Sequence, residues 1–317
     1  MGDWDISDIV VEGAHHCLYR ASKHGQSYLV RLCRPGDAAW PVAEDWQQEV
    51  SRSARWQLDG LLRPLTVEQA PGYCVLVYEA FDGISLVQWL DDYQPGIQHK
   101  LQCALQLVRL LSDLHVQGWL LNALCPESIL INPGVQQVCL ADCGAASPLG
   151  IGRSEEDQTE NLHELHFQSP EASGRTNQAP DHRSDFYSLG VLLYRLFTGV
   201  EPFQSSDANN LIYQHLATIP VVPAALAGDI PPVISGIIMK LLAKSPADRY
   251  QNHAGLQADL QHCLQLLERG DELVAFEIGT QDGIGTFMLT PSLIGRDSEL
   301  ALLQQRFANV CAGQFEC

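Results

Sequence analysis

The sequence has 317 residues, of which 46% are hydrophobic and 18% are charged, and this much apolar material excludes a chain that is disordered throughout. Its 38 acidic and 19 basic residues give a formal net charge of −19. Such a charge repels phosphate backbones and anionic lipid headgroups, so we expect no nucleic-acid partner.

The arrangement of residues along the chain excludes two further classes of protein. No stretch reaches the roughly 18 apolar residues that a membrane span requires. Met1 to Glu12 lacks the basic start and apolar core of a secretory signal. The 10 cysteines include no Cys-x-x-Cys pair, so neither a disulfide framework nor a zinc site is expected. We therefore expect a reduced, cytoplasmic protein without a structural metal or a membrane span.

The first 80 residues alternate short apolar and β-branched segments with turn residues, a pattern typical of strands. Three strands come first, one amphipathic helix follows, and two more strands complete the region. The expected strands are Asp8–Glu12, Cys17–Ala21, Ser27–Cys33, Leu62–Glu68 and Tyr73–Glu79, and the expected helix is Ala43–Leu58.

From Ser85 onward, apolar residues recur at helical spacing, interrupted by a long loop with an acidic run between residues 145 and 184. The expected helices are Leu86–Asp92, His99–Gln117, Asp185–Thr198, Asp207–Thr218, Pro232–Ala243 and Ala254–Arg269, and two short strands are expected at Ile129–Ile131 and Val138–Leu140. The chain is therefore predicted to be an α+β protein. A small β-rich lobe at residues 1–80 would be joined to a larger helical lobe at residues 81–269, with a cleft between them.

Four motif-like segments follow one another in the helical part: Ser169-Pro170-Glu171, Asp185 to Gly190, Leu196 to Phe203, and Leu241 to Tyr250. In this order and spacing they resemble the eukaryotic-type protein kinase fold of bacterial Ser/Thr kinases, over roughly residues 8–268. The resemblance implies a bilobal fold and an ion pair, partly buried, between Glu171 and Arg249. Asp185 is predicted to accept backbone N–H groups as a helix N-cap does.

Phosphate transfer by a kinase needs a base aspartate and an asparagine that binds Mg²⁺, both on one loop. By resemblance, these two positions fall on Ala123 and Ser128. A methyl group accepts no proton, and a hydroxyl is a poor ligand for a hard cation. We therefore predict no catalytic residue, and the resemblance implies a pseudokinase.

The remaining nucleotide-binding positions are altered to different degrees. Gly13 is the one glycine left in the turn that would cover phosphates, and an ordinary strand–turn–strand is favoured over a phosphate cradle. Arg31 replaces the third-strand lysine, and an ion pair with Glu49 is favoured over contact with a nucleotide. Asp142 keeps the aspartate of the Asp-Phe-Gly motif, and metal binding and support of a backbone turn are equal alternatives for it.

The resemblance also assigns Glu79 and Phe81 to nucleotide binding, next to Tyr78 at the apparent gatekeeper position. It allows weak binding of ATP, with Asp142 as the candidate ligand of Mg²⁺, and implies no other cofactor.

Residues 270–290 include Gly270, Gly279, Gly283 and Gly285 and are expected to form a linker. Gly295-Arg296-Asp297, before an amphipathic helix at Glu299–Phe307, resembles the entry to AAA-type or STAND-type ATPase domains. Bacterial fusion proteins place a kinase-like domain before such an ATPase, often with a histidine kinase downstream. Residues 270–317 are therefore predicted to be a linker and the start of an ATPase-like domain. The alternative is a terminal helix that packs on its own domain.

Three functions remain open. The favoured one is a pseudokinase that regulates by conformation or docking, acting on a protein partner or on a downstream ATPase or histidine kinase domain of the same chain. The second is an active Ser/Thr kinase with a displaced base, such as Glu127 or Asp142. The third is a scaffold whose cleft is filled by His15, His16 and Tyr78.

Overall fold

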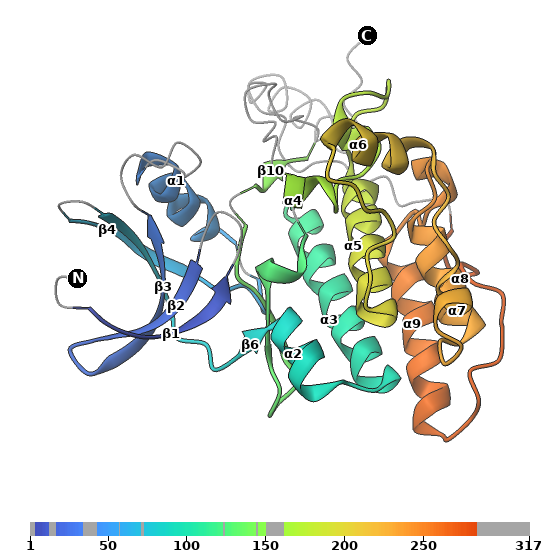
Figure 1. Ribbon diagram of the computed structural model, residues 1–317, viewed down its shortest axis with the longest axis horizontal. Coiled ribbons are helices and arrows are strands. Elements are labelled where there is room, and N and C mark those ends of the chain that lie inside the picture. Colours follow the sequence, from blue (N-terminus) through green and yellow to red (C-terminus); the bar gives the residue numbers. More distant parts are fainter. Residues whose placement is uncertain are drawn as a thin grey trace, which may run out of the picture. The chain divides into compact units, whose positions relative to one another are not determined.

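The computed structural model describes residues 4–12, 17–33, 43–56, 58–70, 73–122, 124–143, 145–149 and 162–283. All of them belong to one compact unit, Met1–Thr286, and a second unit, Phe287–Cys317, lies outside the described residues. Figure 1 shows a β-sheet with one helix, joined to a larger group of helices. The predicted α+β architecture, with a small β-rich lobe and a larger helical lobe, is confirmed.

The small lobe is a five-stranded antiparallel sheet with the strand order β1-β2-β3-β5-β4. A two-residue turn at His24 and Gly25, both with positive φ, joins β2 to β3 and matches the twist of the two strands. One helix contacts β4. The elements are β1 (Asp5–Glu12), β2 (Cys17–Lys23), β3 (Gln26–Cys33), α1 (Ala43–Ser53), β4 (Pro64–Ala70) and β5 (Tyr73–Tyr78).

Helix α1 ends at Ser53, five residues before the predicted end at Leu58. The Ser53 hydroxyl donates to the carbonyl oxygen of Glu49 at 2.8 Å and competes with the backbone at the last turn. Beyond it, Trp56 and Leu58 are buried in the core of the helical lobe. The helix therefore ends where the chain turns to bring these two side chains into the core of the other lobe.

The helical lobe is built around α5, whose residues are buried along most of its length. α5 contacts α3 and α8, and α9 packs against α3. Gly190 permits the close approach of α5 and α8, since a Cβ atom there would lie 2.7 Å from Leu241 Cβ. The helices are α2 (Leu86–Tyr93), α3 (Ile97–Val116), α4 (Leu162–Leu165), α5 (His182–Thr198), α6 (Ala208–Ala217), α7 (Pro223–Leu226), α8 (Pro232–Leu241) and α9 (His253–Glu268).

Short strands line the side of the helical lobe that faces the sheet. They form one small sheet in the order β6-β8-β9 and a second pair of β7 with β10. Across the lobes, the Leu62 N–H donates to the carbonyl oxygen of Leu140 at 2.8 Å, and the Leu140 N–H donates to that of Gly60, which has a φ of +87°, at 2.7 Å. The strands are β6 (Ile84–Ser85), β7 (Trp119–Leu120), β8 (Ile129–Asn132), β9 (Gln137–Leu140) and β10 (Ser147–Pro148).

Residues 271–283 belong to the segment expected to be a linker. They form no helix or strand, but Leu273, Phe276 and Ile278 pack against the core of the helical lobe. The compact unit extends to Thr286, beyond the predicted boundary at residue 269. The ATPase-like segment predicted after it lies outside the described residues. Within the described ranges, no helix combines the length and the apolar character needed to cross a membrane.

Candidate functional site

Arg31, Glu49 and Asp142 meet between the lobes, although they come from β3, α1 and the loop after β9. Arg31 Nη1 lies 3.9 Å from Glu49 Oε2, and Arg31 Nη2 lies 3.3 Å from Asp142 Oδ2. The same Nη2 donates to the carbonyl oxygen of Ala141 at 3.2 Å. The predicted ion pair between Arg31 and Glu49 is present, and the structure adds Asp142 to it.

Burial and the opposite charges set the protonation of this cluster. Burial disfavours the charged guanidinium, but Asp142, Tyr78 and Glu49 together raise the pKa of Arg31 above its ordinary value. Burial also raises the pKa of Glu49 to about 7, although Arg31 acts in the opposite direction. A permanent cation is therefore shared between Asp142 and a glutamate that titrates near neutral pH.

Tyr78 closes the inner end of the cluster. Its hydroxyl donates to Glu49 Oε1 at 3.4 Å, and its ring centroid lies 5.5 Å from Arg31 Cζ. Burial raises the pKa of Tyr78 well above its ordinary value, so the hydroxyl keeps its hydrogen and remains a donor. Tyr78 is the one described member of the filled-cleft hypothesis, since His15 and His16 lie outside the described residues.

Apolar side chains from both lobes pack together beside the charged cluster. Leu18 on β2 and Leu29 on β3 belong to one buried cluster with Leu130 on β8 and with Ala141. Each of the four is at most 5% exposed. The sheet and the helical lobe are therefore in direct apolar contact at this point.

Ser128 uses its hydroxyl within its own turn. Its Oγ donates to the carbonyl oxygen of Cys125 at 2.7 Å and accepts from the Cys125 N–H at 3.3 Å. The side chain is 2% exposed and closes the short helical turn Pro126–Ser128. Ala123 and Gly13, two further predicted site positions, lie outside the described residues. Among the residues that the structure describes, no group of three or more His, Cys, Asp or Glu side chains is placed to hold a metal ion.

Asp185 accepts backbone hydrogen bonds, but not at the start of its own helix as predicted. Asp181 is the N-cap of α5, since the helix begins at His182. The Asp185 carboxylate instead accepts from the N–H groups of Leu121 at 2.8 Å and Asn122 at 2.9 Å. Asp185 therefore holds the loop after β7, where Asn122 has a φ of +63°.

The predicted ion pair between Glu171 and Arg249 is confirmed and is buried completely rather than in part. Arg249 Nη1 lies 2.6 Å from Glu171 Oε1 and Nη2 lies 2.9 Å from Oε2, a bidentate geometry. The Ser184 hydroxyl also donates to Glu171 at 2.7 Å. Burial opposes ionisation, but Arg249 and Ser184 more than offset it and lower the pKa of Glu171. This pair anchors the end of the long loop to the helical lobe.

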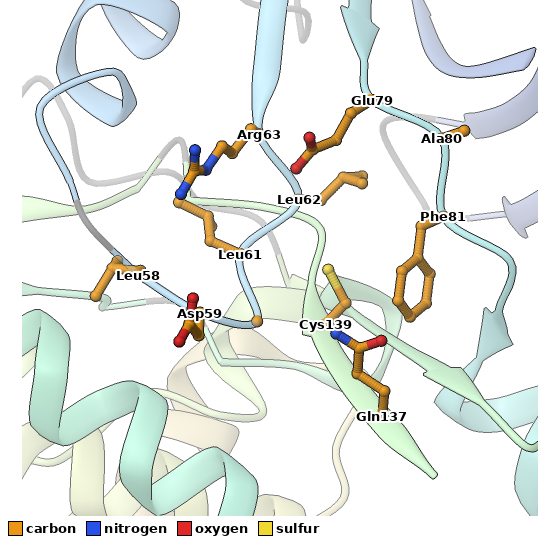
Figure 2. A pocket seen from close by; sticks show the side chains of 11 residues that line it. Leu58, Asp59, Leu61, Leu62, Arg63, Glu79, Ala80, Phe81, Gln137 and Cys139 are labelled. Carbon is orange, nitrogen blue, oxygen red and sulfur yellow. The ribbon is translucent and has the colours of Figure 1, made fainter. Parts of the chain in front are cut away.

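Glu79 and Phe81 lie apart from the charged cluster, on the segment that joins the lobes. They line a small pocket of about 160 Å³, formed with residues 58–63, Gln137 and Cys139 (Figure 2). Arg31, Glu49 and Asp142, all described, are not among its lining residues. Of the five predicted nucleotide-binding residues that the structure describes, three therefore form the charged cluster and two line this pocket, and the sixth, Gly13, lies outside the described residues.

Arg20 is a site residue that the sequence did not indicate. From β2 its guanidinium donates to the carbonyl oxygen of Phe81 at 3.2 Å and to that of Gly83. It thus ties the sheet to the segment between the lobes. An arginine in an alternating strand gives no sequence signal for this contact, because exposed arginines are common on strands.

Comparisons of the sequence with known proteins find similarity to protein kinases. The family model described as "Protein kinase domain" matches residues 12–262. "Hybrid signal transduction histidine kinase G" of Dictyostelium discoideum is 49% identical over 96 residues, covering 30% of this chain and 3% of that protein. "Histidine protein kinase 1" of Candida albicans is 32% identical over 189 residues, covering 56% of this chain and 8% of that protein.

A bacterial relative shows the same similarity over a comparable length. "Serine/threonine-protein kinase PknB" of Mycolicibacterium smegmatis is 31% identical over 188 residues, covering 58% of this chain and 29% of that protein. The chain thus spans less than a third of the length of each of these three relatives.

Proposed function

This chain belongs to the protein kinase family, and we propose that it is a pseudokinase that acts as a regulatory module without transferring phosphate. The observation that carries the proposal is the 3.3 Å contact between Arg31 and Asp142. In kinases the corresponding aspartate binds Mg²⁺ and a lysine contacts the phosphates. Here the two positions neutralise each other.

The residues present do not fit Mg²⁺. Asp142 already faces a guanidinium, which stays charged at every accessible pH. The Ser128 hydroxyl gives its hydrogen to a backbone carbonyl and is buried in its own turn. A hard cation needs several oxygen ligands, and these two positions supply neither a free carboxylate nor an amide oxygen.

Proton transfer also lacks its usual acceptor. By resemblance to protein kinases, Ala123 stands at the base position, and a methyl group cannot take a proton from a hydroxyl substrate. The second function considered is an active kinase with a displaced base. If Asp142 were that base, it would have to accept a proton while paired with Arg31. The geometry therefore favours a signalling role over catalysis.

The packed cleft supports a more specific version of the proposal, in which the domain is a scaffold with an occluded nucleotide site. Leu18 and Leu29 from the sheet belong to one buried cluster with Leu130 of β8, and each of the three residues is at most 2% exposed. A nucleotide base would have to separate these side chains. We therefore propose that ATP binds weakly at most, and without assistance from Mg²⁺.

Thermal unfolding with millimolar ATP, in the presence and absence of Mg²⁺, tests the nucleotide part. We expect the same melting temperature in all conditions, or a small rise with ATP that Mg²⁺ does not enlarge. A rise that requires Mg²⁺ and disappears in Asp142→Asn would contradict the proposal. An unchanged melting temperature would indicate the scaffold with an occluded nucleotide site. A small rise with ATP that Mg²⁺ does not enlarge would indicate a pseudokinase that binds nucleotide.

Transfer of radiolabel from ATP to the chain or to a Ser/Thr substrate tests the catalytic part. We expect no incorporation above a sample without protein. Incorporation that Asp142→Ala abolishes would show an active kinase and overturn the proposal, whereas incorporation that survives this substitution would come from a contaminant.

The names of the relatives support a multidomain signalling context. Two of them are histidine kinases by name, and the matched region is a small part of each. We propose that the domain acts on a protein partner or on an ATPase or histidine kinase domain of the same chain.

A further inference from the structure

Asp282 attaches the segment 271–283 to the base of the helical lobe. Its carboxylate accepts from the Gln251 N–H at 2.7 and 2.9 Å and from the Asn252 N–H at 3.0 Å. Its side chain is 5% exposed. Both N–H groups lie just before the first residue of α9, where backbone donors lack helical partners and favour a negative charge. Asp282 thus holds the two residues before α9 from about 30 positions downstream, while Asn252 is the N-cap of the helix and accepts from the Gly255 N–H at 2.8 Å.

Other contacts show that the attachment is specific. Gly255 leaves room for Asp282, since a Cβ atom there would lie 2.8 Å from Asp282 Cβ. The Gly279 N–H donates to Asp259 Oδ2 at 2.7 Å, and the Phe276 ring lies 4.6 Å from the His262 ring. The segment follows residue 262, where the family match ends. It therefore lies beyond the part of the chain that the family model matches.

Polar contacts continue from the capped end of α9 into the lobe. His253, the first residue of α9, lies with Nε2 2.8 Å from His115 Nδ1. His115 Nε2 lies 2.7 Å from Asp185 Oδ2. The two ring nitrogens of His115 thus face a carboxylate on one side and the His253 ring on the other.

Asp185 connects this chain of contacts to the loop after β7. It holds the N–H groups of Leu121 and Asn122, and the Asn122 amide donates to Ala145 O at 3.0 Å and to Ser147 Oγ at 2.8 Å. An unbroken series of hydrogen bonds and one covalent step from Asn252 to His253 therefore joins Asp282 to this loop.

We propose that the segment 271–283 transmits the conformational state of the loop at Leu121 and Asn122 to the residues that follow it. The proposal rests on the proposed function, because a domain that signals without phosphate transfer needs a physical connection to its target. A shift of Asp185 would move His115 and His253, and with them the start of α9, where Asp282 holds the preceding residues. Conversely, release of Asp282 would loosen the loop, since coupling between two sites is reciprocal.

Amide hydrogen exchange of the whole chain tests this coupling without nucleotide or enzymatic activity. Asp282→Asn removes the charge and keeps the shape, and Glu277→Gln, at an exposed position of the same segment, is the matched control. In Asp282→Asn we expect exchange about fivefold faster at Gln251 and Asn252, because their N–H groups lose a charged acceptor, and about twofold faster at Leu121 and Asn122. Glu277→Gln should exchange as the wild type does.

The His253→Ala background removes the link between the two regions. There, Asp282→Asn should still accelerate exchange at Asn252 but should no longer affect Leu121 and Asn122. The proposal is overturned if Asp282→Asn leaves Leu121 and Asn122 unchanged, if the effect persists in the His253→Ala background, or if exchange rises equally in the ladder between β3 and β5. Detection of phosphate transfer would overturn the proposed function and leave this result standing.

Discussion

Arg31 and Asp142 belong to different lobes, and their side chains meet with Nη2 3.3 Å from Oδ2. The arginine side chain is 6% exposed and that of the aspartate is 26% exposed. Little water therefore screens the pair, and its loss would leave a buried cation short of a partner. In this chain we expect the aspartate to stabilise the fold rather than to serve a metal.

Asp142→Asn should lower the free energy of unfolding by about 1–3 kcal/mol, because a buried donor then loses its charged acceptor. Urea denaturation without nucleotide or metal measures this value. Asp91→Asn, an exposed carboxylate on α2, is the control and should change stability by less than about 0.5 kcal/mol. Equal effects of the two substitutions would show that the Asp142 contact contributes nothing.

Glu49→Gln should make the protein less sensitive to rising pH. The pKa of Glu49 is raised from 4.5 to about 7, so the folded state binds more protons than the unfolded state between these values. The contribution of this group to stability is therefore complete below pH 4.5 and declines as the pH rises through 7. The decline amounts to at most about 3 kcal/mol.

Urea denaturation at pH 5 and pH 8 checks this prediction for Glu49→Gln against wild type. Glutamine cannot ionise, so the variant should lose less stability than wild type over this interval. A control at Glu277→Gln, which is exposed, should follow the wild type. An identical pH dependence of Glu49→Gln and wild type would mean that Glu49 is ionised throughout.

The ion pair between Glu171 and Arg249 could be predicted because the motifs that hold the two residues resemble those of protein kinases, and that resemblance implies the pairing. The contact between Arg31 and Asp142 could not be predicted in the same way. Its existence depends on the path of a flexible arginine side chain that also has Glu49 within reach, at 3.9 Å.

The helices and strands were predictable where apolar periodicity continued to their ends, as in α3 and α8. Helix α1 was predicted too long because Trp56 and Leu58 continue the apolar pattern, although they serve the core of the other lobe. The attachment of residues 271–283 left no such pattern. The glycines of this segment suggest a linker. Its attachment depends on hydrogen bonds to Asp282 from residues about 30 positions upstream.

Arg249→Met should destabilise the protein by about 3–5 kcal/mol, because it leaves the buried Glu171 carboxylate without its bidentate partner. In the double variant Glu171→Gln/Arg249→Met the uncompensated charge is absent, so part of the loss should be recovered. Urea denaturation of the two single variants and the double variant gives the coupling energy. Additive losses would show that the two side chains do not interact.

His253→Gln should reduce the loss of stability at acidic pH. Burial and the neighbouring His115 and His182 lower the pKa of His253 from 6.5 to about 3. The unfolded state therefore binds more protons between these values, and the contribution of His253 is complete above pH 6.5 and falls as the pH falls toward 3. Between pH 6.5 and pH 5 a single histidine of this kind accounts for about 2 kcal/mol.

The measurement is urea denaturation of wild type and His253→Gln at pH 7.5 and pH 5. His215, whose pKa is also lowered to about 3, keeps contributing in both proteins, so the difference between them isolates His253. His99→Gln changes an exposed histidine on α3 and should retain the acid sensitivity of wild type. If His253→Gln is as acid-sensitive as wild type, the imidazole is solvated, and its contact with His115 cannot link α9 to Asp185.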